Sequence, residues 1–220
     1  MSRTLLVAGG LAVVGLAAVS RGWEHKEPPK YRVFGGPEAI WNIPDGRSMG
    51  SSAPVRLRIP TAGVNARIGE IGENADGGIA VPAAAKAREA AWFRSSPTPG
   101  TRGSSIIVGH YDDDKGGAVF YNAYKIKKND KVMVDRADGT VATFAVDAME
   151  QINKSMFPTR RVYGRVGYAG LRLITCGGKF NKDRRHFSDN VIVYAHLTPR
   201  AGTAGKPVRS TPHPPRPAGR

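Results

Sequence analysis

Residues 55–197 contain a succession of short segments in which apolar side chains alternate with polar ones or run together without interruption. The first segment, 55–59, alternates Val, Leu and Ile with Arg and is stopped by Pro60. Alternation is typical of a half-buried β-strand, and a short continuous apolar run is typical of a fully buried one. The remaining segments of this kind lie at 104–109, 131–135, 140–147, 171–175 and 190–196.

One hairpin and one helix complete the expected secondary structure. Asp138 and Gly139 separate two of the predicted strands, and this pair favours the tight turn of a β-hairpin. The alanine-rich run at 83–93 is the best candidate for a helix, which would end before Pro97. About eight short strands with one or two short helices predict a mainly β fold, a closed or nearly closed β-barrel.

The amino-terminal end has a different composition. Residues 4–20 are uncharged and apolar and lie between Arg3 and Arg21. A helix of this length spans roughly 26 Å, slightly less than the hydrocarbon core of a bilayer, which thins locally around short helices. We therefore expect residues 1–21 to form an N-terminal transmembrane helix that anchors the chain, and small residues near its end leave a cleaved signal peptide as the alternative.

Composition also divides the rest of the chain. Residues 22–54 are rich in proline and glycine, show no sustained periodicity and predict a linker. The folded domain is expected at 55–198, and the Pro/Gly/Arg-rich residues 199–220 are expected to form a disordered basic tail. The predicted organisation is therefore an anchor, a linker, one domain and a tail.

The chain carries 33 Lys and Arg residues against 18 Asp and Glu, a formal net charge of +15. Such a surface attracts polyanions, which include anionic lipid headgroups, acidic wall polymers and nucleic acid. The basic residues are dispersed rather than gathered into one stripe with interleaved aromatic residues, and no nucleic-acid-binding motif is present. We therefore expect no nucleic-acid partner, and the charge fits either an anionic wall polymer or a solvated basic surface.

The single cysteine, Cys176, excludes an intramolecular disulfide and a multi-cysteine zinc site. It ends a predicted strand and is followed by Gly177 and Gly178, which permit unusual backbone angles and the close approach of another chain. This position suits a thiol that attacks a peptide carbonyl, and it suits a small buried core residue equally well. Position alone leaves both interpretations open.

Of the five histidines, His110 is distinctive because it follows Gly109 at the end of an apolar strand. An imidazole at a strand end, beside a polar loop, can act in acid–base chemistry, although a structural role is the commoner fate of a histidine. The aspartates at 112–114 come next, but three consecutive carboxylates lack the alternating spacing of a calcium-binding loop. We expect neither a metal nor another cofactor.

Several segments resemble the sortase family, and they are most similar to the class F sortases of high-GC Gram-positive bacteria. The two most specific are IIVGHYDDDKGGAVF at 106–120 and LRLITCGGKF at 171–180, the second followed by DNVIVYA at 189–195. The order of Gly-His and then Thr-Cys, each at a strand end, carries the resemblance. Further similarity extends it over residues 55–197, with matching segments at 55–60, 74–78, 81–82, 131–146 and 157–164.

The resemblance implies an eight-stranded sortase-type β-barrel and a cysteine transpeptidase. Cys176 matches the nucleophile of the family, His110 matches its histidine, and Thr175 would help to shape the oxyanion site. The arginine of the family follows the cysteine. We choose Arg185 for this role, with Arg184 as the alternative.

The implied reaction is cleavage of a Leu-Pro-x-Thr-Gly-like sorting signal between Thr and Gly through a cysteine thioester, then transfer of the acyl group to a cell-wall amine. The implied partners are sorting-signal peptides of secreted proteins, a peptidoglycan-precursor amine and the cell membrane, with the catalytic domain outside the cytoplasm. Tyr111 and Asn181 depart from the usual class F pattern, and Tyr111 would alter the groove beside His110.

Two other functions fit part of the sequence. An L,D-transpeptidase also uses cysteine and histidine, but its Ser-His-Gly-Cys run is absent from this chain. A membrane-tethered basic β-domain that binds anionic wall polymers without catalysis would use the charge and leave Cys176 as a structural residue. A thiol reagent separates the alternatives, because it labels a nucleophilic cysteine in the native protein and leaves a core cysteine protected.

Overall fold

The computed structural model of the protein describes residues 24, 26–44, 46, 48–75, 77–183 and 185–199. The predicted transmembrane anchor at 1–21 and nearly all of the predicted basic tail lie outside these residues. Within the described part of the chain, no helix has the length and apolar character needed to cross a bilayer.

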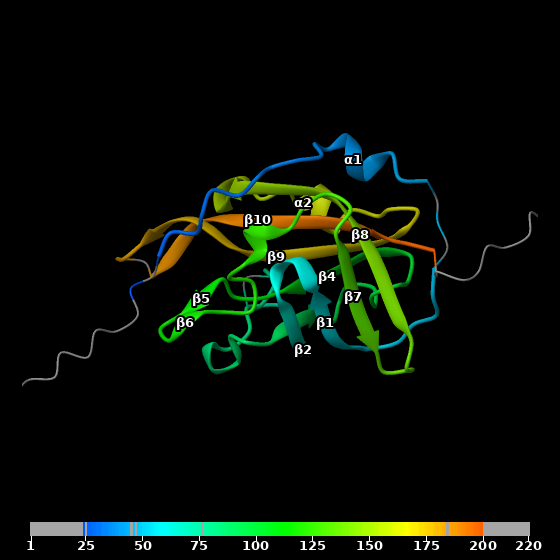
Figure 1. The fold of residues 1–220 in the computed structure, drawn as a ribbon, viewed down its shortest axis with the longest axis horizontal. Coiled ribbons are helices and arrows are strands. Elements are labelled where there is room, and N and C mark those ends of the chain that lie inside the picture. The colour runs from blue at the N-terminus through cyan, green and yellow to red at the C-terminus, as the bar shows by residue number, and fades with distance from the viewer. Residues whose placement is uncertain are drawn as a thin grey trace, which may run out of the picture.

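Eight strands close into a barrel, and the predicted mainly β, closed-barrel fold is confirmed (Figure 1). Around the barrel the strands follow the order β1-β2-β3-β4-β9-β10-β8-β7. β2 pairs with β3, and β4 pairs with β9, in parallel. The strand bounds are β1 Pro54–Ile59, β2 Val64–Ile71, β3 Ala90–Phe93, β4 Gly103–Val108, β7 Lys131–Arg136, β8 Val141–Asn153, β9 Ala169–Asn181 and β10 His186–Leu197.

Short elements connect and cover the barrel strands. A separate two-stranded ribbon is formed by β5 and β6 in the loop that follows β4. The bounds are β5 Asp112–Asp113, β6 Gly116–Gly117, α1 Glu38–Trp41, α2 Thr159–Tyr163, η1 Pro60–Ala62, η2 Ala84–Lys86, η3 Ala123–Lys125 and η4 Lys154–Met156, where η marks a 3-10 helix.

Alternate side chains of the barrel strands enter two separate apolar clusters. Leu57 and Ile107 belong to the cluster that fills the barrel interior. Ile106 and Ile174 belong to a second cluster, on the outward face, which includes residues of α1 and α2. Because residues two apart on a strand share a face, cluster membership shows which way a neighbouring side chain points.

The predicted helix at 83–93 is wrong. Residues Ala84–Lys86 form a single 3-10 turn, and Ala90–Phe93 form β3, all of whose residues are buried. β3 lies between β2 and β4, and the Trp92 indole donates to Ser96 Oγ at 3.1 Å and to the Pro97 carbonyl at 3.2 Å. Pairing on both edges of β3 outweighs the helix propensity of alanine, which is a weak preference that tertiary contacts override.

The other predicted strands are confirmed, and three of them are longer than predicted. β8, β9 and β10 each continue past their apolar run into polar residues. Antiparallel pairing sustains the extension, since Asp189 still pairs with Asn153. The predicted hairpin turn is confirmed by the hydrogen bond from the Arg136 N–H to the Thr140 carbonyl and by the φ of 78° at Gly139.

Part of the predicted linker packs against the barrel. Phe34 and Met149 of β8 exchange backbone hydrogen bonds of 3.1 and 3.0 Å, and the Tyr168 hydroxyl donates to the Ile40 carbonyl at 2.9 Å. Tyr31 is buried within the interior cluster. Figure 1 shows this segment and α1 running over the barrel above β10. The segment from Tyr31 to Ile40 is therefore part of the folded body.

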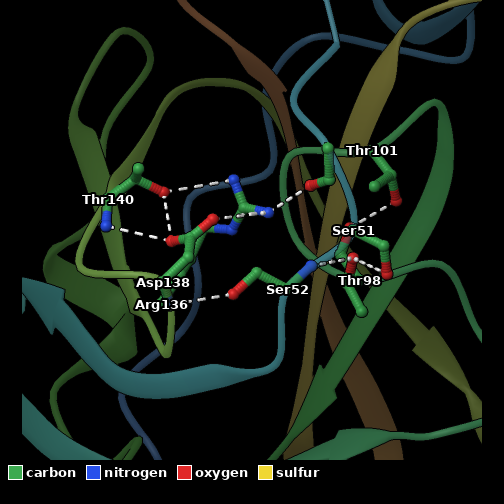
Figure 2. Close-up of polar contacts among 8 residues, drawn as sticks. Ser51, Ser52, Thr98, Thr101, Arg136, Asp138 and Thr140 are labelled. Carbon is green, nitrogen blue, oxygen red and sulfur yellow. Dashed lines mark hydrogen bonds and ion pairs between the residues drawn. The ribbon is translucent and has the colours of Figure 1, made fainter.

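A polar network at the β7–β8 turn fastens the chain that precedes β1 (Figure 2). The Arg136 guanidinium donates to the Gly50 carbonyl and to Thr140 Oγ1, and it lies 3.6 Å from Asp138 Oδ2. The Asp138 N–H in turn donates to Ser52 Oγ at 3.1 Å. This network stabilises the end of the barrel at which β8 begins.

Candidate active site

Cys176 lies within β9, which continues to Asn181, on the outward face of the barrel. The predicted end of the strand at Cys176 is therefore wrong. It pairs with Asn190 of β10, which pairs in turn with Ile152 of β8. Ile174 belongs to the outward-facing cluster, and Cys176, two residues later, shares its face. The cysteine is partly exposed. The thiol is therefore at the surface of the barrel and not within its interior.

The backbone around Cys176 requires the two glycines that follow it. A side chain at Gly177 would place its Cβ 2.7 Å from Val191 Cγ2 on the neighbouring strand. Gly178 has a φ of 77°, and a Cβ there would collide with Ser188 Oγ. Both expected uses of glycine, the close approach and the unusual backbone angle, are therefore present.

His110 follows the end of β4, which runs parallel to β9. Val108 lies opposite Ile174, and the Gly109 N–H donates to the Ile174 carbonyl at 3.1 Å. His110 and Cys176 therefore each follow, by two residues, the last paired position of two neighbouring strands that are far apart along the chain.

A backbone carbonyl fixes the orientation of the His110 ring. The imidazole Nε2 lies 2.6 Å from the Pro82 oxygen. A carbonyl oxygen can only accept a hydrogen bond, so Nε2 carries the proton and donates it. In the neutral ring, Nδ1 is then the nitrogen that remains able to accept a proton.

The sulfur has charged neighbours of both signs. Lys154 Nζ, at the start of η4, lies 3.8 Å from Cys176 Sγ. Burial raises the pKa of the Cys176 thiol, the Lys154 ammonium lowers it, and the nearby Asp112 carboxylate raises it. On balance the pKa of the thiol is above its ordinary value.

Arg185 lies in the turn between β9 and β10, beyond the strand pairs that include Cys176. Its side chain is 76% exposed, and its guanidinium is 3.7 Å from Asp114 Oδ1 in the loop after His110. The structure therefore places Arg185 beside the histidine loop and pairs it with a carboxylate rather than with the sulfur. Arg184 lies outside the described residues.

Thr175 points away from the sulfur. It pairs with Val191 of the interior cluster, and it is buried. Among the residues that the structure describes, its Oγ1 has no hydrogen-bond partner. Any contribution of Thr175 to an oxyanion site would therefore come from its backbone.

A family model described as a sortase domain matches residues 57–198, which is more than half of the chain. This chain belongs to the sortase family. Members of the family are cysteine transpeptidases. No curated protein matches this sortase.

Solved sortase structures share the fold at low sequence identity. Sortase A from Corynebacterium diphtheriae matches with a TM-score of 0.52 and 18% identity, over 70% of this chain and 64% of that one. Sortase C-1 from Actinomyces oris matches with a TM-score of 0.52 and 20% identity, over 66% and 75%. The chain thus spans slightly less than two thirds of the Corynebacterium protein, and the likeness concerns the fold.

Tyr111, directly after His110, packs within an aromatic group of this sortase. The ring is 2% exposed and packs against Tyr121 at 5.2 Å and against Phe187 of β10 at 5.4 Å between ring centroids. Tyr111 therefore connects the loop after His110 to the β9–β10 hairpin.

A cavity of about 540 Å³ lies along β4 of the sortase domain, upstream of His110. Its lining combines the β3–β4 connection, Ser104 and Ile106 of β4, and the chain from Tyr163 to Val166 after α2. Neither His110 nor Cys176 lines it. The cavity therefore lies apart from the residues of the candidate site.

Sequence reasoning missed Lys154, Asp112 as a neighbour of the thiol, and the Pro82 carbonyl. Lys154 and Pro82 are in connections whose path depends on the whole barrel, and neither belongs to a recognisable motif. The aspartate was considered only as a metal ligand. The one available signal was its position two residues after His110.

Proposed function

We propose that this sortase-family protein is a membrane-anchored, extracytoplasmic transpeptidase of the class F kind. It cleaves Leu-Pro-x-Thr-Gly-like sorting signals of secreted proteins between Thr and Gly and transfers the acyl group to a peptidoglycan-precursor amine. The observation that supports the proposal is the parallel β4–β9 register, in which the last pair, Val108 with Ile174, precedes both His110 and Cys176 by two residues.

The first half of the reaction forms a thioester. The Cys176 thiolate attacks the threonyl carbonyl carbon, and the carbonyl electrons move onto oxygen. When the tetrahedral intermediate collapses, the C–N bond to glycine breaks and His110 gives its proton to the departing amine. No cofactor takes part in this step.

The second half reverses the roles. The acceptor amine attacks the thioester carbonyl and loses a proton to His110, and the C–S bond breaks to release the Cys176 thiolate. A new peptide bond replaces the original one, so atoms and charges balance without an external oxidant or reductant.

The charge states of the two groups limit the rate. An ordinary thiol is ~3% ionised at pH 7, which corresponds to a barrier contribution of roughly 2 kcal/mol. Burial of Cys176 makes ionisation harder still. We expect a slow enzyme with a bell-shaped pH–rate profile.

Arg185 has the proposed role of binding the substrate carbonyl or the developing oxyanion through charge-assisted hydrogen bonds. It is 76% exposed and forms an ion pair with the exposed Asp114. Surface ion pairs contribute little stability, so the guanidinium is free to exchange this carboxylate for a bound peptide. Arg184 is the alternative.

The decisive experiment uses the purified full chain and a Leu-Pro-x-Thr-Gly peptide library, with and without an amine nucleophile. We expect an intact-mass increase equal to the acyl fragment, which is attributable to a single position because the chain has one cysteine. Cys176→Ala should form no adduct. If no peptide acylates the protein while it binds acidic wall polymer, the non-catalytic basic β-domain is the correct function.

A further inference from the structure

The contact between Lys154 and Cys176 joins two elements whose relative position is set by the barrel. β8 ends at Asn153, which pairs with Asp189 of β10, and β10 pairs with β9 around Cys176. Lys154 follows immediately, and its Nζ lies 3.8 Å from Cys176 Sγ. The pairing of β8 with β10 and of β10 with β9 therefore holds the ammonium beside the sulfur.

The turn that carries Lys154 is itself fixed. The side chain of Asn153 accepts hydrogen bonds from the Ser155 N–H at 3.0 Å and from its hydroxyl at 2.7 Å. These bonds close the first turn of η4 and fix the backbone at Lys154. Only the torsions of the lysine side chain then remain variable. A charge that is held in place before the reaction loses little freedom when it acts, which is the condition for electrostatic preorganisation.

We infer that Lys154 is the cationic partner of the Cys176 thiolate and a further catalytic residue of this protein. This inference rests on the proposed nucleophilic role of Cys176. Lys154 donates an N–H to the sulfur and stabilises its negative charge before the attack on the peptide carbonyl and again when the thioester is released. The exposed Arg185, which pairs with Asp114, is left for the substrate.

The surroundings of the sulfur explain why such a partner is needed. Burial and the Asp112 carboxylate both disfavour the thiolate, whereas Lys154 favours it. Tyr31 is also within electrostatic range of the sulfur, and its buried hydroxyl is neutral, since burial raises its pKa. His110 follows the last β4–β9 pair, Val108 with Ile174, by two residues, as Cys176 does. Lys154 is thus the basic side chain that contacts the sulfur.

The test is a pH titration of the Cys176 thiolate in the purified full chain, followed by ultraviolet absorbance and by the rate of alkylation. The single cysteine makes both signals specific. We expect Lys154→Met to lower the alkylation rate near neutral pH by about tenfold or more and to move the whole profile to higher pH, because an opposite charge within 4–6 Å shifts a thiol by that order. Lys154→Arg should restore most of the rate.

Lys131→Met is the matched control, since Lys131 is exposed at the start of β7 and its removal changes the net charge equally. Circular dichroism melting verifies that each variant is folded. If the profiles of Lys154→Met, Lys131→Met and the unmodified protein coincide, Lys154 is not the partner of the thiolate. If Lys154→Arg behaves like Lys154→Met, the charge is not what acts, and the inference is likewise wrong.

Alkylation does not require the sorting peptide, so the two proposals fail separately. A shifted profile without peptide acylation supports the Lys154–Cys176 pair and removes the proposed function. Peptide acylation with an unshifted profile supports the function and removes the role of Lys154.

Discussion

The Nε2 atom of His110 donates its proton to the carbonyl oxygen of Pro82 across 2.6 Å. Pro82 lies just before η2, the short 3-10 turn found in place of the predicted helix. The carbonyl of Pro82 therefore orients the histidine ring from this segment. The neutral histidine is therefore expected as the Nε2–H tautomer, with Nδ1 as the atom that exchanges protons during the reaction.

Replacing His110 by alanine is expected to slow acyl transfer by about 10²- to 10⁴-fold, the usual contribution of a general acid–base residue. Alkylation of Cys176 should continue, because the thiol remains at the surface. Single-turnover acylation checks the rate, and nitrogen chemical shifts of labelled histidine check the tautomer. An Nδ1–H tautomer in the native protein would contradict the role of the Pro82 carbonyl.

Arg185→Ala is expected to lower kcat/KM by about 10²- to 10³-fold, the loss seen when one oxyanion donor is removed, and to leave the alkylation profile unchanged. The stability should change by less than about 1 kcal/mol, because the ion pair with Asp114 is exposed. Arg184→Ala is the matched control. If the large effect appears in Arg184→Ala instead, the guanidinium function belongs to that neighbour.

Thr175→Val is expected to raise the free energy of unfolding by about 1 kcal/mol. The Oγ1 atom is buried without a partner among the described residues, and an apolar group of the same shape removes that penalty. Acyl transfer should stay within about twofold of the unmodified protein, since the hydroxyl points to the interior cluster. Urea unfolding and peptide kinetics provide the two readouts. A tenfold loss of rate would place the hydroxyl in the oxyanion site after all.

The pair of His196 and Asp147 should make stability depend on pH. The hydrogen bond to Asp147, 2.7 Å long, raises the pKa of His196 above its ordinary value. A raised pKa means that the stabilisation is complete below about pH 6.5 and is lost as the pH rises through the folded-state value.

His196→Gln should therefore reduce the free energy of unfolding by on the order of 1 kcal/mol at about pH 5.5 and by much less at about pH 8.5. Urea unfolding at the two pH values measures the difference. Asp147→Asn should abolish the same pH dependence. Equal losses at both pH values in His196→Gln would contradict the proposed charge contribution.

Arg136→Met is expected to reduce the free energy of unfolding by about 2–3 kcal/mol, because the Gly50 carbonyl loses a buried charged donor. Its guanidinium side chain is 1% exposed, whereas Arg67 on β2 is exposed and serves as the matched control in Arg67→Met. Acyl transfer by the folded fraction should be unchanged, since Cys176 pairs with Asn190 of β10, which lies opposite Ile152 near the other end of β8. A loss of rate without a loss of stability would connect this turn to the site.

Much of the barrel was readable from local pattern because strands with one buried face alternate. Residues 55–59 became β1 almost as predicted, and the turn at Asp138 and Gly139 formed where its residues indicate. The helix predicted at 83–93 was wrong because all residues of β3, Ala90 to Phe93, are apolar and buried. The strand therefore shows no alternation of apolar and polar positions. Small apolar residues on both faces of a strand give no period to read.

The residues of the candidate site were likewise predicted only where a local sequence pattern marks them. Cys176 and His110 were identified because each follows an apolar strand within a motif, and the structure adds that these strands are neighbours. Lys154 was not identified, because its distance to the sulfur results from pairing across β8, β10 and β9. A contact that depends on the pairing of three strands has no local sequence pattern by which it could be predicted.

The parallel pairing of β4 with β9 determines when reactivity arises. Parallel neighbours need a long crossover, and contacts between distant parts of a chain form late in folding. In a partly folded molecule, the segment that follows β4 and the segment that carries Cys176 are therefore still unconnected. The proposed thioester chemistry would arise only after β4 and β9 have paired.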